Sequence, residues 1–305
     1  MPGALIATCV LLLTGCAAQG GAAPSRSAPH QANRKAGGAG RQPSIFRSLP
    51  GPNRAPRRLL TRIALRVGSS RRAHVTVQSV VRFRQTDYHM DVYNPESPIA
   101  FTLLGTTVHD VAASAASATI VSTIPTRFTF ASRQDAVHWR ASGTPRLPAP
   151  SRRGDVMNEP KGRFSFLSLG TTLNYEAARH LPTSSRDIEA AVLSHVRSYA
   201  SDPSTALLLV QYGVLLAIAP ISPPVRMGLL TAAARLPELH ACRHHFRDMR
   251  YRTVCADSDQ REVELVLDQL SGRVRAVREY LRQRLPYTGL HVGALVECQT
   301  FVIHA

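Results

Sequence analysis

Aromatic residues and lysine are scarce in this 305-residue chain. Aromatic residues make up 6% of it, and Lys35 and Lys161 are the only lysines, so arginine supplies nearly all of the positive charge. No apolar run reaches the roughly 18 residues that a membrane-spanning helix needs, which excludes a multi-pass membrane protein. Charged residues make up 19% of the chain and apolar residues 44%, which excludes a wholly disordered polyelectrolyte.

The motifs of several large enzyme classes are also missing. The sequence has no Gly-x-Ser-x-Gly elbow, no His-Glu-x-x-His zinc helix, no phosphate-binding P-loop and no Gly-x-Gly-x-x-Gly turn. We therefore predict no catalytic residues and no cofactor. A hydrolase of another kind would need a pocket in which titratable groups converge from distant positions of the chain.

What the chain has in abundance is positive charge, with a formal net charge of +17 and a pI near 10.8. A strong positive field attracts nucleic acid, anionic lipid headgroups or anionic wall polymers. The arginines are dispersed, however, and are not interleaved with aromatic residues that would stack on bases. Together with abundant Ala, Gly and Pro, such a composition is also typical of a GC-rich genome, so the charge has a compositional explanation as well as a functional one.

The N-terminus predicts export and a lipid anchor. Residues 4–14 form an apolar stretch of signal-peptide length, which ends in Leu13-Thr14-Gly15-Cys16. This ending resembles the lipobox of bacterial lipoproteins, in which the cysteine becomes the lipidated first residue of the mature chain. The resemblance implies a signal peptide at 1–15, lipidation of Cys16, and a location on the extracytoplasmic face of the cell membrane.

A disordered, flexible linker is expected over residues 16–57, because Gly, Ala, Ser, Pro and Arg cannot bury enough apolar surface to offset chain entropy. The next residues, 58–67, have helical periodicity. Arg58, Arg62 and Arg66 follow one another at four-residue spacing, and apolar residues gather on another side. The segment is either a basic helix that lies on anionic lipid, or an ordinary surface helix or short strand packed on a domain.

Strands are predicted next. Residues 73–84 alternate, with Phe83 on an apolar face and Arg82 and Arg84 on the opposite face, which is typical of a half-buried strand. Composition and periodicity then predict a strand at 88–93, an Ala-rich helix at 107–121, and strands at 126–132, 136–141 and 163–169.

The second half is predicted to hold three helices and then a series of strands. The helices are expected to begin at a capping box at Ser184, at Pro203 in the first helical position, and at Pro223. The second helix is nearly all apolar as far as Ala219, and we expect it to be a buried core helix. The tail strands are expected at 239–246, 249–255, 262–267, 274–281 and 290–303, with Gly272 available for a left-handed turn position.

This order of elements predicts an α+β fold. We expect a curved, half-barrel-like antiparallel sheet with a three-helix insertion packed on it. An N-terminal strand and helix segment is expected at 58–106, before an envelope domain at 107–305.

Several short motifs resemble a group of actinobacterial cell-envelope proteins of unknown function. The motifs are spread over residues 107–305: Trp139, Leu181-Pro182-Thr183, Pro223-Pro224, Leu236-Pro237, and Leu267-Asp268 with Ser271-Gly272-Arg273. At the level of fold alone, the strand–helix–strand order is similar to lipoprotein carriers such as LolA. That resemblance implies a concave sheet that holds an apolar ligand beneath helices, and it supplies no catalytic residues.

Two of the cysteines that follow the linker are predicted to form a disulfide bond. If the first two tail strands form a hairpin, Cys242 and Cys255 lie almost directly opposite each other, near disulfide range. An oxidising envelope permits the bond. Cys298 is then expected to be a small buried residue.

The alternative is a metal site on the same strands. His240, Cys242 and His244 alternate, so one strand face would present all three, and Cys255 would supply a fourth ligand. Two imidazoles and two thiolates suit zinc or copper. The spacing matches no established zinc motif.

Together these features predict a lipid-anchored envelope protein that binds an apolar or lipidic ligand or a protein partner without catalysis. The alternative is an arginine-rich nucleic-acid-binding protein of the cytoplasm. The two differ in whether Cys16 is acylated and in whether the protein binds DNA or RNA with steep salt dependence.

Overall fold

A computed structural model describes residues 54–69, 80–93, 97–114, 117–147, 156–160, 178–197, 200–242, 248–284 and 290–304. The expected signal peptide, Cys16, most of the expected linker and the predicted strand at 163–169 lie outside these residues. The described residues belong to one compact unit, Pro52–Ala305.

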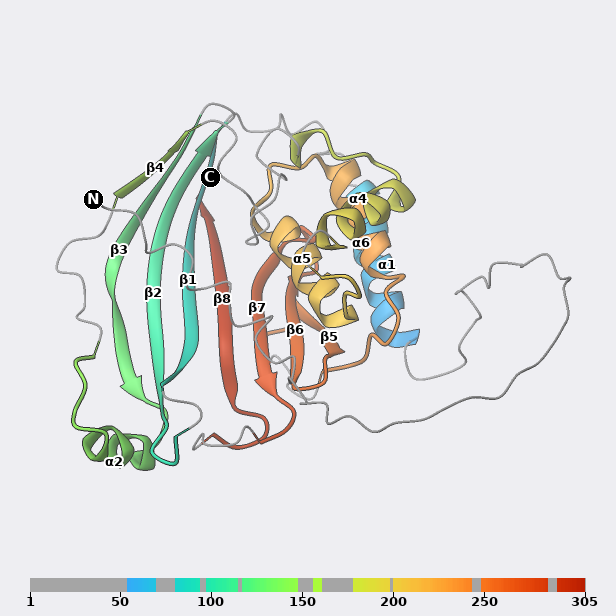
Figure 1. The fold of residues 1–305 in the computed structure, drawn as a ribbon. Helices are drawn as coiled ribbons and strands as arrows, with labels where there is room; N and C mark the ends of the chain where they lie inside the picture. Colours follow the sequence, from blue (N-terminus) through green and yellow to red (C-terminus); the bar gives the residue numbers. More distant parts are fainter. Residues whose placement is uncertain are drawn as a thin grey trace, which may run out of the picture. The chain divides into compact units, whose positions relative to one another are not determined.

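The described strands form one antiparallel sheet that is not closed into a barrel (Figure 1), in the order β4-β3-β2-β1-β8-β7-β6-β5. The pairing of β1 with β8 joins an N-terminal meander to a C-terminal one. The strands are β1 (Val80–Tyr93), β2 (Phe101–Ser114), β3 (Ser117–Phe130), β4 (Val156–Pro160), β5 (Tyr251–Asp257), β6 (Arg261–Asp268), β7 (Val274–Leu281) and β8 (Leu295–His304).

Helices pack on the C-terminal half of this sheet. Helix α5 contacts β5, β6, β7 and β8; α4 and α6 pack on α5, and α1 packs on α6 (Figure 1). The described helices are α1 (Arg54–Ser69), α2 (Arg133–Ala141), α4 (Ser185–Arg197), α5 (Thr205–Ile218) and α6 (Pro223–Ala233). The predicted α+β class and the three-helix insertion between strands are therefore confirmed.

Alternation along the strands separates the helix-covered core from the opposite face. In β6, Val263, Leu265 and Leu267 join the core beneath the helices, whereas Glu262 and Glu264 point to the other face. Helix α5 is buried nearly all round, as its apolar sequence predicts. No helix among the described residues is long and apolar enough to span a membrane.

The predicted basic helix is present as the major part of α1. Leu60, Ile63 and Val67 are buried in the shared core, and the arginines at 58, 62 and 66 are exposed on the other side. The segment is thus a surface helix packed on the domain, with a basic face turned to solvent.

Two secondary-structure predictions are wrong. Of residues 107–121, expected to be helical, 107–114 belong to β2 and 117–121 to β3, and 115–116 lie outside the described residues. Residues 136–141, expected to be extended, belong to α2, whose N-cap Ser132 accepts a hydrogen bond from the backbone N–H of Asp135 at 3.2 Å. That cap satisfies one of the N–H groups that have no partner within the first turn of a helix. Ser132 is therefore a helix-start signal, which the β-type composition around Trp139 obscured.

Other boundaries shift by a few residues. Pro203 precedes helix α5 rather than occupying its first position, because Ser204 is the N-cap and its hydroxyl accepts from Leu207 N. Residues 239–242 make a single bridge, between His240 and Cys255, in place of a strand. Strand β2 runs through residue 106, where the sequence analysis divides the chain. The last four tail strands are confirmed as β5 to β8, and Gly272 has the left-handed φ of +66° that the β6–β7 turn requires.

Candidate functional site

Cys242 and Cys255 form a disulfide bond, with their Cα atoms 5.2 Å apart. The backbone bridge pairs Cys255 with His240, so Cys242 lies two residues from the directly opposite position that the sequence predicted. A shift of two residues keeps a side chain on the same face of the sheet. Both cysteines are buried, at 5% and 0% exposure, and Cys298 is a free, partly buried thiol.

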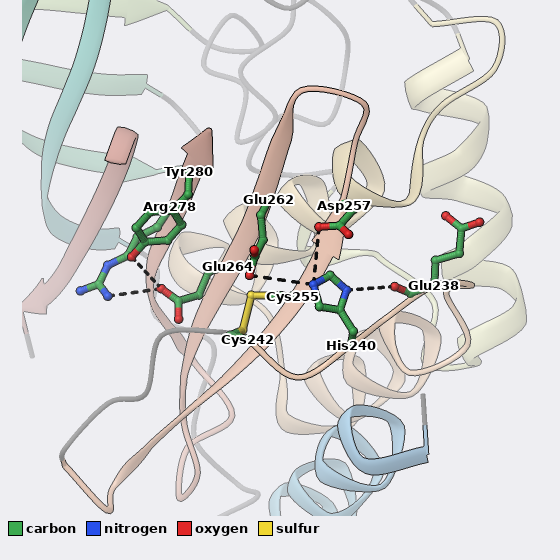
Figure 2. The surroundings of a disulfide bond; sticks show 9 residues. All are labelled: Glu238, His240, Cys242, Cys255, Asp257, Glu262, Glu264, Arg278 and Tyr280. Atoms are coloured by element: carbon green, nitrogen blue, oxygen red, sulfur yellow. Dashed lines mark hydrogen bonds and ion pairs between the residues drawn. A yellow bond between two sulfur atoms is a disulfide. The ribbon is translucent and has the colours of Figure 1, made fainter. Parts of the chain in front are cut away.

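His240 stands beside the disulfide with two acidic residues (Figure 2). Its Nε2 atom lies 3.5 Å from Asp257 Oδ1 and 3.9 Å from Glu262 Oε1. Its Nδ1 atom lies 3.3 Å from the carbonyl oxygen of Glu238, to which an Nδ1–H donates. The imidazole is therefore oriented with Nε2 toward the carboxylates.

A buried carboxylate lies on the other side of the disulfide. Glu264 is 1% exposed, and its Oε2 accepts from Arg278 Nη1 at 3.3 Å and from the Tyr280 hydroxyl at 3.2 Å (Figure 2). Burial and the neighbouring Glu264 raise the pKa of Tyr280 to about 12, so the hydroxyl keeps its proton and acts as a donor. The negative charge of Glu264 is thus matched by one cation and one neutral donor.

The predicted metal ligands are only partly brought together. Among the described residues, two groups of three potential ligand atoms lie within 4.8 Å of one another: His240, Cys255 and Glu262, and Cys242, Cys255 and Glu264. Position 244 lies outside the described residues. While the disulfide is intact, its two sulfur atoms are not thiolates and cannot serve as thiolate ligands.

A second group of side chains, mostly charged or titratable, lies on the helix-facing side of the sheet. It alternates along β1 after Phe83, whose side chain joins the helix-covered core, and it continues on β2, β6, β7 and β8. We call this group the charged belt: Gln85, Asp87, His89, Asp91, His109, Arg261, Glu279 and Glu297.

The belt residues contact one another in pairs. Gln85 Nε2 donates to both carboxylate oxygens of Asp87, at 2.9 and 3.1 Å, and His109 Nε2 lies 3.5 Å from Asp87 Oδ2. His89 Nε2 lies 3.4 Å from Asp91 Oδ2.

On the C-terminal strands of the belt, Arg261 lies close to two glutamates, Glu279 and Glu297. Arg261 Nη1 lies 2.6 Å from Glu279 Oε2 and 3.5 Å from Glu297 Oε2. Burial and the like charge of Glu279 raise the pKa of Glu297 to about 7. Burial also raises the pKa of Asp87, and the hydrogen bond to Asp91 raises the pKa of His89. Carboxyl groups that ionise near pH 7 are typical of functional sites.

Gly105 gives the belt room on β2. A Cβ atom at this position would lie 2.5 Å from Nε2 of His89, and His89 in turn packs edge-on against Phe128 at 6.3 Å. A ring on β1 therefore lies over a strand position that has no side chain. Beyond it, Tyr93 and Phe101 stack at 5.0 Å, so aromatic rings border the belt.

Protons stabilise the folded belt. Asp87, His89 and Glu297 each have a raised pKa, so these groups bind protons more tightly in the folded chain than in the unfolded chain, and for Glu297 the difference extends from about pH 4.5 to pH 7. We expect the free energy of unfolding to fall as pH rises through this window. Because the Glu297 side chain is 36% exposed, its share is expected to be only about 1 kcal/mol. The Glu297→Gln variant should lose that share of the pH dependence in urea unfolding at pH 5 and pH 7.5.

Comparison of the wild type with the Glu297→Gln variant isolates the contribution of Glu297 to the pH dependence. His195 has a pKa lowered by burial and so contributes with the opposite sign, but it is present in both proteins and cancels in the difference. Equal pH dependence in wild type and variant would contradict the assignment of a near-neutral pKa to Glu297.

The belt is the part of the candidate site that the sequence analysis missed. Its four β1 members stand at every second position, from 85 to 91, which is the period of one strand face. That polar alternation was available in the sequence, but the pairing of β1 with β8, which brings Glu297 to the same face, was not. No family model, curated protein or solved structure matches this chain.

Proposed function

We propose that this protein is an exported, lipid-anchored binding protein of the cell envelope. The observation that carries the proposal is the buried Cys242–Cys255 disulfide, since such bonds are typical of oxidising compartments and rare in the cytoplasm. It agrees with the lipobox-like sequence that ends at Cys16. Both features favour export over the alternative of a cytoplasmic nucleic-acid-binding protein.

The binding face that we propose is the charged belt. Four carboxyl groups and one arginine gather there, in a chain whose net charge is +17. Acidic groups beside aromatic rings favour a ligand with positive charge. The described large apolar side chains that are exposed lie on separate elements and loops, which gives less support to an apolar or lipidic ligand. We therefore propose that the belt binds a basic segment of a protein partner.

Substitution of Cys16 tests the proposed lipid anchor. Cells that express the protein are fed a palmitate analogue, and the protein is compared with its Cys16→Ala variant. We expect label and membrane association in the wild type and neither in the variant. Cys9→Ala, inside the expected signal peptide, should still be labelled. An unlabelled wild-type protein that keeps its first methionine would overturn the export proposal and promote the nucleic-acid-binding alternative.

The binding face is tested with a short oligoarginine peptide and an oligoglutamate control. We expect the wild type to prefer the cationic peptide, with an affinity that falls as salt rises. The Asp87→Asn, Glu297→Gln double variant should bind it about tenfold more weakly, which corresponds to about 1.4 kcal/mol. Burial disfavours the charged form of both residues, so neutral replacements should not destabilise the fold.

Replacement of the same number of acidic residues elsewhere provides the control. Asp202 and Asp259 are exposed outside the belt, and their replacement by asparagine should leave peptide affinity unchanged. Equal weakening in both double variants would mean that net charge alone attracts the peptide.

A hydrolase is the second candidate, because a carboxyl group with a pKa of about 7, such as Glu297, suits general acid–base catalysis. Turnover of chromogenic esters or glycosides by the wild type, and its loss in Glu297→Gln, would favour that function over binding.

A further inference from the structure

We propose that the disulfide site becomes a zinc site when the disulfide is reduced, with His240, Cys242, Cys255 and Glu262 as the ligands. The reduced pair provides two thiols in a place where an imidazole and a carboxylate already converge. Two sulfurs, one nitrogen and one oxygen suit the tetrahedral coordination of Zn²⁺. This inference goes beyond the proposed anchoring and binding and does not depend on them.

The backbone holds three of the ligands on one face. His240 and Cys242 are two residues apart, and His240 bridges to Cys255 through both backbone hydrogen bonds, at 2.9 and 3.1 Å. Ligand atoms of His240, Cys255 and Glu262 lie within 4.8 Å of one another. Cys242 is grouped with Cys255 and Glu264, so after reduction its side chain would turn toward the first group to complete the site.

The neighbouring residues favour Glu262 over Glu264 as the fourth ligand. Glu262 Oε1 faces Nε2 of His240 at 3.9 Å and belongs to the ligand group that contains both His240 and Cys255, whereas the group of Glu264 does not include His240 (Figure 2). The hydrogen bond from His240 Nδ1 to the Glu238 carbonyl fixes the ring with Nε2 turned inward, as in many zinc sites. The His240 side chain is 27% exposed, so the group lies near the protein surface.

The chemistry needs a dithiol reductant, such as dithiothreitol. One of its thiolates attacks a disulfide sulfur to form a mixed disulfide, and its second thiolate then closes the reductant's own disulfide. The reductant loses two electrons and two protons, and Cys242 and Cys255 gain them as thiols. Zn²⁺ then displaces both thiol protons into water as the two Zn–S bonds form. The disulfide and the metal are therefore mutually exclusive states of one site.

The test uses the full chain, reduced and then freed of dithiothreitol without air. Titration with Co²⁺ should produce thiolate-to-cobalt charge-transfer absorption and the visible bands of tetrahedral cobalt, and one equivalent of Zn²⁺ should abolish both. The oxidised protein should show neither signal. A reduced wild type that binds no Co²⁺ or Zn²⁺ would overturn the proposal.

Single substitutions assign the ligands. We expect Cys242→Ser to weaken Zn²⁺ binding at least 100-fold, and His240→Gln and Glu262→Gln to weaken it at least tenfold. Cys298→Ser should change nothing, because that thiol lies outside both ligand groups. Equal zinc affinity in wild type and His240→Gln would also overturn the proposal, since adventitious binding to two free thiols would explain it.

Folding is followed by near-ultraviolet circular dichroism during the titration. His240→Gln retains both cysteines and can fold and oxidise before reduction, so it reports on binding even if Cys242→Ser fails to fold. If reduction alone unfolds the wild type, Zn²⁺ should restore the folded spectrum. A reduced chain that stays unfolded with Zn²⁺ would contradict the site.

Discussion

Replacing Cys242 and Cys255 together by serine is expected to lower the free energy of unfolding by about 3 kcal/mol. The bond closes a loop with a sequence separation of 13, and in the chain-entropy model a cross-link of that length removes about this much conformational freedom from the unfolded chain. It also ties residues 240–242 to β5, which is the last strand of the sheet in the described residues. Urea unfolding of the oxidised wild type and the double variant measures the difference.

Two comparisons distinguish the effect of losing the cross-link from the effect of changing the cysteine side chains. Cys298→Ser changes a partly buried free thiol and should alter the free energy of unfolding far less than the double substitution. Reduction of the wild type should reproduce most of the loss that the double variant shows. Since native domains have a stability of about 5–15 kcal/mol, a fold that loses about 3 kcal/mol can persist, as the reduced zinc site requires. A double variant as stable as the wild type would show that packing alone holds this edge.

The elements that could be predicted are those whose signals are local. Helix α6 begins at two prolines after Ser222, α5 is nearly all apolar and ends before Pro220, and β7 spans the predicted residues 274–281. In each case the residues that start, stop or bury the element lie within it or next to it. Their interpretation needs no knowledge of the rest of the chain.

The secondary-structure predictions that were wrong concern elements whose structure depends on residues far away in the sequence. The Ala-rich segment from 107 has good helix formers, but Val111 and Ala113 pack in a core made by helices from the other half of the chain. Alanine fits that face because the space is small, and tertiary packing outweighs its helix propensity. Sequence alone does not show which surface will cover a strand.

The candidate site likewise has one part that could be predicted from local sequence and one part that could not. The disulfide could be predicted because strand parity places Cys242 and Cys255 on one face even when the register is off by two. The charged belt could not, since Asp87 and Glu297 are more than 200 positions apart and meet only through the pairing of β1 with β8. The same pairing makes the belt continuous across both halves of the sheet.

Replacing Arg58, Arg62 and Arg66 together by glutamine is expected to weaken binding to anionic vesicles by roughly 100-fold. The three guanidinium groups lie exposed along one side of α1, close after the linker that we expect to lead from the membrane anchor. Each basic residue near an anionic surface contributes about 1 kcal/mol, so three contribute about 3 kcal/mol. The measurement uses the Cys16→Ala chain, so that no acyl chain dominates binding, with vesicles of mixed neutral and anionic phospholipid.

The control removes the same charge from another helix and its flank. Arg133, Arg140 and Arg146 are exposed at and after α2, and their replacement by glutamine lowers the net charge by the same three units. A basic face on α1 predicts a large loss for the first triple variant, a small loss for the second, and a difference that shrinks as salt rises. Equal losses would show that the protein's net charge attracts it to the membrane and that α1 has no special role. In that case the positive charge of the whole chain, and not one helix face, would add to the membrane affinity that the expected acyl chain supplies.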